Sequence, residues 1–309
     1  MLINKFKGSD YKISKLGLGT VQFGLDYGFT KKKTQDEVNS ILETAVDNDV
    51  TLIDTAREYG DSESKIGNFI SEFDNDFVIA TKLRLIDNLN DLDFNTLENS
   101  IYSSVNESLD SLSLDKIPIL QLHQTDEILF KNADFWEVIA QLKEDNLIDL
   151  FGVSVYGLEE TQFILNNFTD SVDFFQIPYN IFDRRFEDMY DILSDNSVGL
   201  ISRSTFLKGI IPCSLEDVPK ELDGIKYFKK ELEELANSLD LRVDELANLF
   251  VYSNDFINST IFGVNSSEEL EKNIMTLDKY NDELFENVDF DKLRIYDVNL
   301  IDPRLWADF

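Results

Sequence analysis

The chain contains 309 residues, of which 43% are hydrophobic, so it is long and apolar enough to bury a sizeable core. Its 60 acidic and 28 basic residues give a formal net charge of −32, which opposes binding to nucleic acid or to an anionic membrane surface. The single cysteine, Cys213, excludes an internal disulfide and a cysteine-based zinc site, and we expect no bound metal.

Neither a membrane span nor a secretory signal is visible in the sequence. No uninterrupted apolar stretch approaches the roughly 18 residues that a spanning helix needs. The first residues, MLINKFKGSDYK, lack the apolar region of a secretory signal. We therefore expect a cytoplasmic protein that has no membrane partner.

Short apolar runs rich in β-branched residues alternate with amphipathic stretches along the chain. The runs that we predict to be buried strands span 16–20, 50–54, 77–81, 117–122, 149–154, 172–177, 198–202 and 259–263. Helices are predicted at 35–48, 62–73, 95–112, 132–146, 158–167, 186–195, 225–252 (as two helices) and 267–280. Eight such repeats, without a Pro/Gly/Ser-rich linker, predict a single domain over residues 1–309 that folds as a (β/α)₈ TIM barrel.

The two ends of the chain lie outside this repeat. Residues 1–14 predict a short hairpin before the first strand. Residues 281–309 form a tail, and its aromatic residues Trp306 and Phe309 indicate that it packs back onto the barrel. Two helix starts fit the capping-box pattern, Thr34 with Glu37 and Ser266 with Glu269.

Polar residues end three successive predicted strands. Asp54 ends the run 50–54, Lys82 follows the run 77–81, and His123, the only histidine, follows the run 117–122. Tyr59 lies in the loop that leaves the Asp54 strand. Because the C-terminal ends of parallel barrel strands meet at one mouth, where such barrels keep their active sites, we expect these four side chains to lie together.

These four side chains suit the reduction of a carbonyl group. The carbonyl oxygen gains negative charge when hydride reaches its carbon, and it then needs a proton. A tyrosine, whose pKa is about 10, is a poor acid at neutral pH, and we expect Lys82 to lower the pKa of Tyr59. Asp54 would orient Lys82, and His123 would donate a hydrogen bond to the carbonyl oxygen.

Each residue also has a structural interpretation when it is taken alone. Tyr59 fits a packing residue, Asp54 a helix N-cap, Lys82 a solvated strand end and His123 a buried structural histidine. Their coincidence at one predicted mouth favours the catalytic interpretation.

Five segments of the chain resemble motifs of the aldo/keto reductase family, in the same order. They are GLGTVQFG at 17–24, IDTAREYGDSESKIG at 53–67, FGVSVYG at 151–157, QIPYNIFDRR at 176–185 and FGVNSSEELEKN at 262–273. The resemblance implies a (β/α)₈ barrel that binds NADP(H), or less often NAD(H), without a Rossmann domain. It implies NAD(P)H-dependent reduction of an aldehyde, ketone or sugar to an alcohol. The catalytic tetrad of the family falls on Asp54, Tyr59, Lys82 and His123, with Tyr59 as general acid.

The resemblance also implies which residues bind the cofactor. They are Gly19, Thr20, Ser154, Gln176, Ser202, Arg203, Ser204, Phe206, Gly209, Gly263, Asn265, Glu269 and Asn273. Ser154 and Gln176 fall where the family binds the nicotinamide carboxamide, although Val155 replaces an Asn that commonly follows the serine. Arg203 replaces the Trp or Tyr that often stacks on the nicotinamide. Its guanidinium suits stacking on that ring and equally suits a pyrophosphate or an acidic neighbour.

The choice between NADP(H) and NAD(H) stays open at this point. The family favours NADP(H), but Asn265 and Glu269 stand where its NADP-dependent members generally carry basic or amide residues. A carboxylate near a 2′-phosphate is unfavourable and favours NAD(H) or dual use, unless Lys272 or the helix N-terminus offsets it.

The expected partner is a small-molecule carbonyl substrate, and a sugar is one candidate. Residues predicted to line the substrate pocket are Phe23, Asp26, Tyr27, Arg57, Tyr156 and Trp306. An alternative is a cofactor-binding regulatory or redox-sensing protein on the same fold, comparable to the potassium-channel β subunits, because such regulators keep the tetrad as well.

Overall fold

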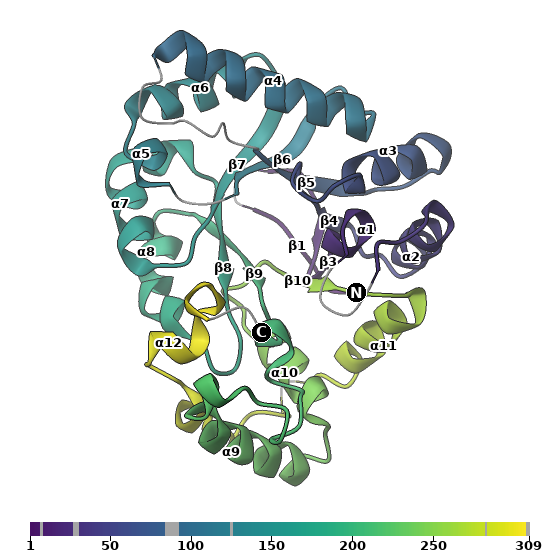
Figure 1. Cartoon of the computed structure of the whole chain (residues 1–309), viewed down its shortest axis with the longest axis vertical. Helices are drawn as coiled ribbons and strands as arrows, with labels where there is room; N and C mark the ends of the chain where they lie inside the picture. The colour runs from purple at the N-terminus through teal and green to yellow at the C-terminus, as the bar shows by residue number, and fades with distance from the viewer. Residues whose placement is uncertain (7–8, 27–30, 84–92, 124–125, 282, 307–309) are drawn as a thin grey trace.

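The computed structural model describes residues 1–6, 9–26, 31–83, 93–123, 126–281 and 283–306. Its centre is a closed barrel of parallel strands in the order β10-β3-β4-β5-β6-β7-β8-β9, with helices around it (Figure 1). The strands are β3 (Leu16–Gly19), β4 (Leu52–Asp54), β5 (Val78–Leu83), β6 (Ile117–Leu122), β7 (Ile148–Ser154), β8 (Phe174–Pro178), β9 (Gly199–Arg203) and β10 (Ser259–Gly263). The predicted (β/α)₈ barrel is confirmed, and each predicted strand overlaps an observed one.

The strand register places the predicted site residues at one rim. The barrel closes where Gly19 of β3 pairs with Gly263 of β10. Gly19 also lies opposite Asp54 of β4, and Ser154 of β7 lies opposite Gln176 of β8. These pairs come from the C-terminal ends of their strands, so their side chains share the mouth of the barrel.

The long helices also follow the prediction. They are α2 (Gln35–Asp47), α3 (Ser62–Glu72), α4 (Phe94–Leu112), α6 (Ala133–Glu144), α7 (Leu158–Phe168), α8 (Tyr190–Asp195), α9 (Ile225–Ser238), α10 (Val243–Tyr252) and α11 (Ser267–Leu277). The predicted split of 225–252 is confirmed, because the chain turns through Asp240, which has a left-handed φ of 54°, between α9 and α10. The short helices α1 (Val21–Gly24), α5 (Glu127–Phe130) and α12 (Val298–Ile301) were not predicted.

The two predicted capping boxes differ in the structure. Thr34 and Glu37 form a complete box at the start of α2. At α11 only one half of the capping box forms, in which Ser266 Oγ accepts the backbone N–H of Glu269 at 3.2 Å. The Glu269 carboxylate instead accepts the backbone N–H of Asn265 at 2.8 Å.

The N-terminal hairpin closes the end of the barrel opposite the site. Its strands β1 (Ile3–Asn4) and β2 (Ile13–Ser14) pair antiparallel, which confirms the predicted hairpin. Phe6, in the connection between them, stacks on Phe174 of β8 with ring centroids 5.2 Å apart. A Cβ on Gly199 would lie 2.3 Å from the Phe6 ring, so the glycine leaves the space that this aromatic plug fills.

The C-terminal tail packs against the barrel, as its aromatic residues predicted. It contains three short helical segments, Phe290–Leu293, α12 and Pro303–Leu305. The backbone N–H of Ile295 donates to the carbonyl of Phe182 at 2.9 Å, and Trp306 packs against the main core cluster. Phe309 lies outside the described residues. The tail therefore packs against the segment that follows β8.

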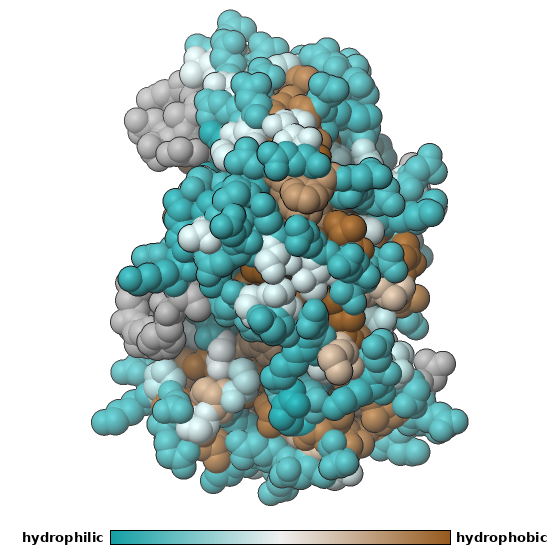
Figure 2. Space-filling view, turned by 90° about the vertical axis from the view of Figure 1, so that its right-hand side faces the viewer, coloured by the Kyte–Doolittle hydropathy of each residue, from teal (hydrophilic) through white to brown (hydrophobic). Residues whose placement is uncertain are grey.

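The outer face that carries α2, α3 and α11 is mostly hydrophilic, with scattered apolar residues, as Figure 2 shows. This distribution agrees with the net charge of −32. Among the described residues, no helix is both long and apolar enough to span a membrane.

Candidate active site

A buried ion pair joins Asp54 at the end of β4 to Lys82 of β5. Lys82 Nζ donates to Asp54 Oδ2 at 2.7 Å and to the carbonyl of Thr55 at 2.8 Å. Burial alone would lower the pKa of Lys82, but Asp54 and Tyr59 outweigh burial and raise that pKa. The lysine therefore stays a cation although only 2% of its surface is exposed.

The second oxygen of Asp54 is held by two glutamine side chains. Oδ1 accepts from Gln121 Nε2 at 3.0 Å and from Gln176 Nε2 at 2.8 Å. Gln176 was predicted as a cofactor residue, whereas Gln121 was not predicted at all. The signal that would have found Gln121 is an amide within the apolar run of β6, two residues before His123.

The loop that carries Tyr59 packs backbone against backbone on α1. A Cβ on Gly24 would lie 1.6 Å from the carbonyl oxygen of Tyr59, and one on Gly60 would lie 2.3 Å from the carbonyl oxygen of Gly24. Gly60 also has a φ of 60°, which glycine adopts without strain. These two glycines allow the close approach that fixes Tyr59 at the mouth.

The Tyr59 ring lies beside two other catalytic candidates, Lys82 and His123. Lys82 Nζ is 5.1 Å from the centroid of the Tyr59 ring. The ring of His123 meets that of Tyr59 edge to face, with centroids 5.7 Å apart. The structure thus brings together the four side chains that the sequence assigned to one site.

The pKa of Tyr59 departs from the sequence-based expectation. Burial raises the pKa of this phenol, and that effect outweighs the lowering by Lys82 and Arg203. Lys82 lowers the pKa of Tyr59, as expected, but desolvation of the ring has the larger effect and leaves the pKa above its ordinary value. The phenol keeps its proton at neutral pH, and Lys82 reduces the cost of forming a phenolate there.

His123 is neutral over most of the pH range. Burial lowers its pKa to about 4, with Lys82 and Arg203 acting in the same direction and Asp54 against them. Glu58 Oε2 lies 3.0 Å from Nδ1 of the ring, but within the described part of the chain Nδ1 has no partner in hydrogen-bonding geometry. A neutral imidazole beside Tyr59 is suited to hydrogen bonding with a carbonyl oxygen.

A groove of about 290 Å³ runs from Asp54 and Tyr59 along the rim to β10. Eight of the predicted cofactor residues line it: Gly19, Thr20, Gln176, Arg203, Ser204, Phe206, Gly209 and Gly263. The lining also includes Gln22 and Thr205, which were not predicted. Two buried oxygens, Gln22 Oε1 and Thr205 Oγ1, have no hydrogen-bond partner among the residues that the structure describes. Such unpaired polar atoms in a groove are expected where a polar ligand binds.

The segment after β9 provides a second sign of a ligand. Ser204, Leu207, Lys208 and Gly209 all have left-handed φ angles, between 48° and 88°. This conformation strains the three residues that carry a Cβ. Backbone N–H groups in such turns form concave sites for anions. A dinucleotide with a pyrophosphate therefore fits this groove.

The remaining predicted cofactor residues do not line the groove. Ser154 is buried at the end of β7, and Ser202 Oγ donates to Thr260 Oγ1 at 2.8 Å within the barrel wall. Asn273 accepts from Asn248 of α10 at 3.3 Å. Asn265 Nδ2 donates to Glu269 Oε2 at 3.0 Å beyond the end of β10.

Several predicted substrate residues point elsewhere. Phe23 is fully buried, and Asp26 accepts the backbone N–H of Lys32 within its own loop. Arg57 bonds Glu63 at 3.0 Å and also pairs with Glu107, towards α3 and α4. Tyr27 lies outside the described residues. Tyr156 stands beside Arg203, whose guanidinium carbon is 4.0 Å from the ring centroid.

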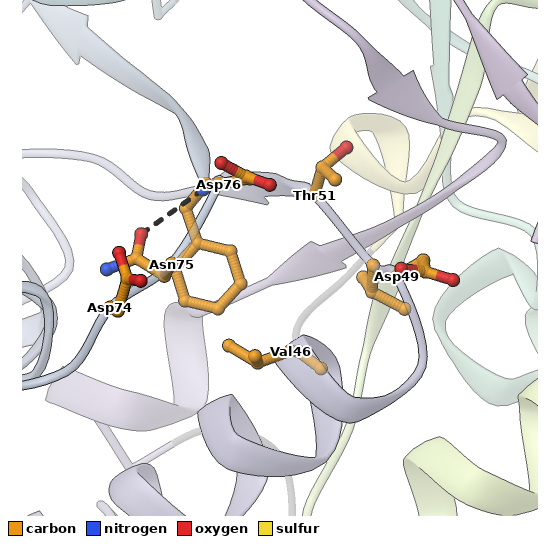
Figure 3. A pocket seen from close by; sticks show the side chains of 9 residues that line it. Val46, Asp49, Thr51, Asp74, Asn75 and Asp76 are labelled. Carbon is orange, nitrogen blue, oxygen red and sulfur yellow. Dashed lines mark hydrogen bonds between the residues drawn. The ribbon is translucent and has the colours of Figure 1, made fainter.

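A separate pocket of about 190 Å³ lies between the end of α2 and the turns that precede β4 and β5 (Figure 3). Asp49, Asp74 and Asp76 surround it, and Asn75 Oδ1 accepts the backbone N–H of Phe77 at 3.2 Å. The described residues contain no group of three or more His, Cys, Asp or Glu side chains placed to hold a metal. This pocket is at the N-terminal end of the strands, away from the four clustered side chains.

The closed barrel and the side chains at its mouth agree with the sequence motifs, and comparison with known proteins gives the family. Residues 15–290 match the model of the aldo/keto reductase family. The chain therefore belongs to this family of oxidoreductases.

Individual relatives are distant. The uncharacterized oxidoreductase YqkF of Bacillus subtilis (strain 168) is 24% identical over 289 residues, which cover 87% of this chain and 89% of YqkF. L-glyceraldehyde 3-phosphate reductase of Escherichia coli (strain K12) is 22% identical over 299 residues, with 85% of each chain covered. The solved structure of glycerol dehydrogenase AKR11B4 from Gluconobacter oxydans superposes with a TM-score of 0.73 at 20% identity, covering 97% of this chain and 96% of that one.

Proposed function

We propose that this protein is an NAD(P)H-dependent reductase that converts a small carbonyl compound to an alcohol, with Tyr59 as general acid. The observation that carries the proposal is the buried pair of Lys82 with Asp54 at 2.7 Å, placed beside Tyr59 and opening onto the groove. This arrangement keeps one cation next to a protonated phenol in a site of low polarity, where electrostatic effects are strong.

Each residue of the site has its own role in the proposed reduction. His123 binds the carbonyl oxygen and orients it towards Tyr59. When bound in the groove lined by Gln176 and Arg203, a reduced nicotinamide cofactor would be the source of hydride for the carbonyl carbon. Tyr59 gives its phenolic proton to the oxygen, and Lys82 stabilises the phenolate until a proton from solvent restores the phenol. Asp54 keeps Lys82 charged and correctly placed, and Gln121 and Gln176 hold Asp54.

In this proposal the residues beyond the end of β10, at the start of α11, favour NADH over NADPH. Glu269 Oε2 is fixed by the backbone N–H and the Nδ2 of Asn265, at 2.8 and 3.0 Å. Lys272, the nearest cation considered for a 2′-phosphate, pairs with Asp244 of α10 at 3.3 Å. A phosphate placed here would meet a carboxylate instead of a free cation, which weakens its binding.

The substrate class that we propose is a small polar aldehyde or ketone, including sugars. The relative named L-glyceraldehyde 3-phosphate reductase supports a sugar-derived carbonyl. The mouth itself offers polar and aromatic contacts through Glu58, Tyr156 and Arg304.

A panel of aldehydes, ketones and sugars tests the proposal when cofactor oxidation is followed at 340 nm with NADH and with NADPH. Turnover by the wild-type chain, and its loss in Tyr59→Phe, is the expected result. If the wild-type chain binds the cofactor but reduces no member of a broad panel, the proposed reductase activity would be contradicted.

A further inference from the structure

Arg203 is a cation without a carboxylate partner at the rim of the groove. Its Nη2 donates to the carbonyl of Val155 at 3.2 Å, and its Nη1 donates to Ser204 Oγ at 3.4 Å. Among the residues that the structure describes, no Asp or Glu forms an ion pair with it. In a chain with a net charge of −32, an arginine left unpaired at the site has its full charge available to a ligand.

Aromatic stacking, rather than an ion pair, holds this guanidinium. The Arg203 carbon Cζ lies 4.0 Å from the centroid of the Tyr156 ring, and Cζ of Arg304, from the tail, lies 3.7 Å from the same centroid. Stacked arginine–tyrosine contacts of this kind are attractive and fix the plane of the guanidinium.

The tail is itself anchored beneath this stack. Asp302, which is 2% exposed, accepts from Arg304 Nε at 3.0 Å and from Nη2 at 2.7 Å. Arg185 Nη1 donates to the carbonyl of Tyr156 at 3.1 Å and lies 3.8 Å from Asp302. The tail and the β7–α7 loop are therefore linked at the point where Tyr156 supports Arg203.

The charge of Arg203 reaches the reacting groups. It lowers the pKa of Tyr59 and that of His123 through space. A nicotinamide that passes hydride to a carbonyl bound at Tyr59 must lie within a few ångströms of that ring. The reduced nicotinamide ring is neutral and the oxidised ring carries a positive charge, so a nearby cation repels only the oxidised form.

We propose that Arg203 makes this site bind the reduced cofactor in preference to the oxidised one, and that Tyr156 and the tail residue Arg304 are positioning residues for Arg203. This inference rests on the proposed function, since it requires a nicotinamide in the groove. It assigns the tail a part in setting the relative affinity of the site for the reduced and the oxidised cofactor.

The test is a set of dissociation constants for NADH, NAD⁺ and ADP-ribose, measured by titration calorimetry on the full chain. In Arg203→Met we expect the ratio of the NAD⁺ constant to the NADH constant to fall about tenfold, as loss of one partly screened charge contact predicts. ADP-ribose lacks the nicotinamide, so its constant should stay within about twofold of that of the wild-type protein. Arg203→Lys keeps the charge and should keep most of the preference.

The positioning roles are tested by matched variants. Tyr156→Phe retains the ring and should retain the ratio, whereas Tyr156→Leu and Arg304→Met should lower it by a few-fold. Melting temperatures confirm that each variant is folded, and the ADP-ribose constant shows that the rest of the groove is intact.

The possible failures are distinct. If Arg203→Met weakens all three ligands equally, Arg203 contacts the shared pyrophosphate and the inference is overturned, while the proposed function stands. An unchanged ratio in Arg203→Met overturns it as well. A ratio that responds to Arg203→Met but not to Tyr156→Leu or Arg304→Met overturns the positioning roles. A wild-type chain that binds neither NADH nor NAD⁺ overturns the proposed function and this inference together.

Discussion

Two buried lysines, one at each end of the barrel, show how partners decide the role of a cation. Lys82 at the C-terminal mouth pairs with the Asp54 carboxylate, and its pKa is raised. Lys15 at the N-terminal end donates to the carbonyls of Asn254, at 2.6 Å, and Ile257. Burial lowers its pKa to about 8, and the charge of Asp255 compensates only in part.

The different partners of Lys82 and Lys15 suit them to different roles. A lysine held by a carboxylate next to a phenol supports proton transfer, whereas a lysine that binds backbone carbonyls holds loops together. The same division holds for the whole molecule, since the N-terminal end is closed by the hairpin and Phe6 while the mouth opens onto the groove.

The largest expected effect comes from replacing each lysine by methionine. Lys82→Met removes the cation beside Tyr59 and should lower carbonyl reduction by about two decades or more. Lys15→Met leaves the buried carbonyl of Ile257 without the Lys15 donor, while the carbonyl of Asn254 keeps the backbone N–H of Ile257 at 3.2 Å. It should reduce the free energy of unfolding by about 1–3 kcal/mol, with turnover changed only a few-fold. Steady-state rates and urea unfolding of both variants measure the contrast. Comparable losses of activity in the two would contradict the division.

A pH effect on stability is expected from His123, whose pKa is about 4 in the folded chain against an ordinary value of 6.5. As the pH falls from 6.5 to 4, His123 is protonated in the unfolded chain but stays mostly neutral in the folded chain. The contribution of His123 to the free energy of unfolding is therefore fully present above pH 6.5 and decreases below it. The loss reaches about 3 kcal/mol at pH 4.

Urea unfolding of the wild-type chain and of His123→Gln at several pH values isolates this contribution, because the acidic residues titrate in both. The chain has one histidine, so a single imidazole NMR signal reports the same pKa. A midpoint near 6.5 would show that the ring is solvated and not enclosed by the site.

The smallest expected effect concerns the cofactor preference that we assign to Glu269 of α11. Because Glu269 replaces a basic residue, we expect NADH to bind within about tenfold of NADPH, a difference of at most ~1.4 kcal/mol. Glu269→Lys should shift the preference towards NADPH by about tenfold. Lys272→Met is the matched control and should leave the preference unchanged, since Lys272 pairs with Asp244. A hundredfold preference of the wild-type chain for NADPH would place the 2′-phosphate elsewhere.

The sequence was sufficient to predict the barrel and the grouping of four side chains at its mouth, for a physical reason. Apolar runs of strand length and amphipathic helices alternate along the chain, and polar residues at strand ends point to one mouth whatever the loop structure. Asp54, Lys82 and His123 could therefore be grouped before any contact was known.

Side-chain directions in loops and long-range contacts could not be predicted in the same way. Phe23 and Arg57 follow strands, as Tyr59 does. In the structure, however, Phe23 lies in the core and Arg57 points towards Glu63. Gln121 was missed because one amide in an apolar strand resembles an ordinary core position. The contact between Tyr156 and Arg304 depends on how the tail docks, which local patterns do not encode.

The most direct test of the account is a single-turnover measurement of NADH oxidation by Tyr59→Phe, using the best carbonyl substrate of the panel. Tyr11→Phe is the matched control, because Tyr11 is hydrogen-bonded to Asp149 away from the groove. We expect Tyr59→Phe to slow hydride transfer by about 100-fold or more, with NADH affinity nearly unchanged, and Tyr11→Phe to react at the wild-type rate. Near-wild-type turnover in Tyr59→Phe would contradict the assignment of Tyr59 as the proton donor.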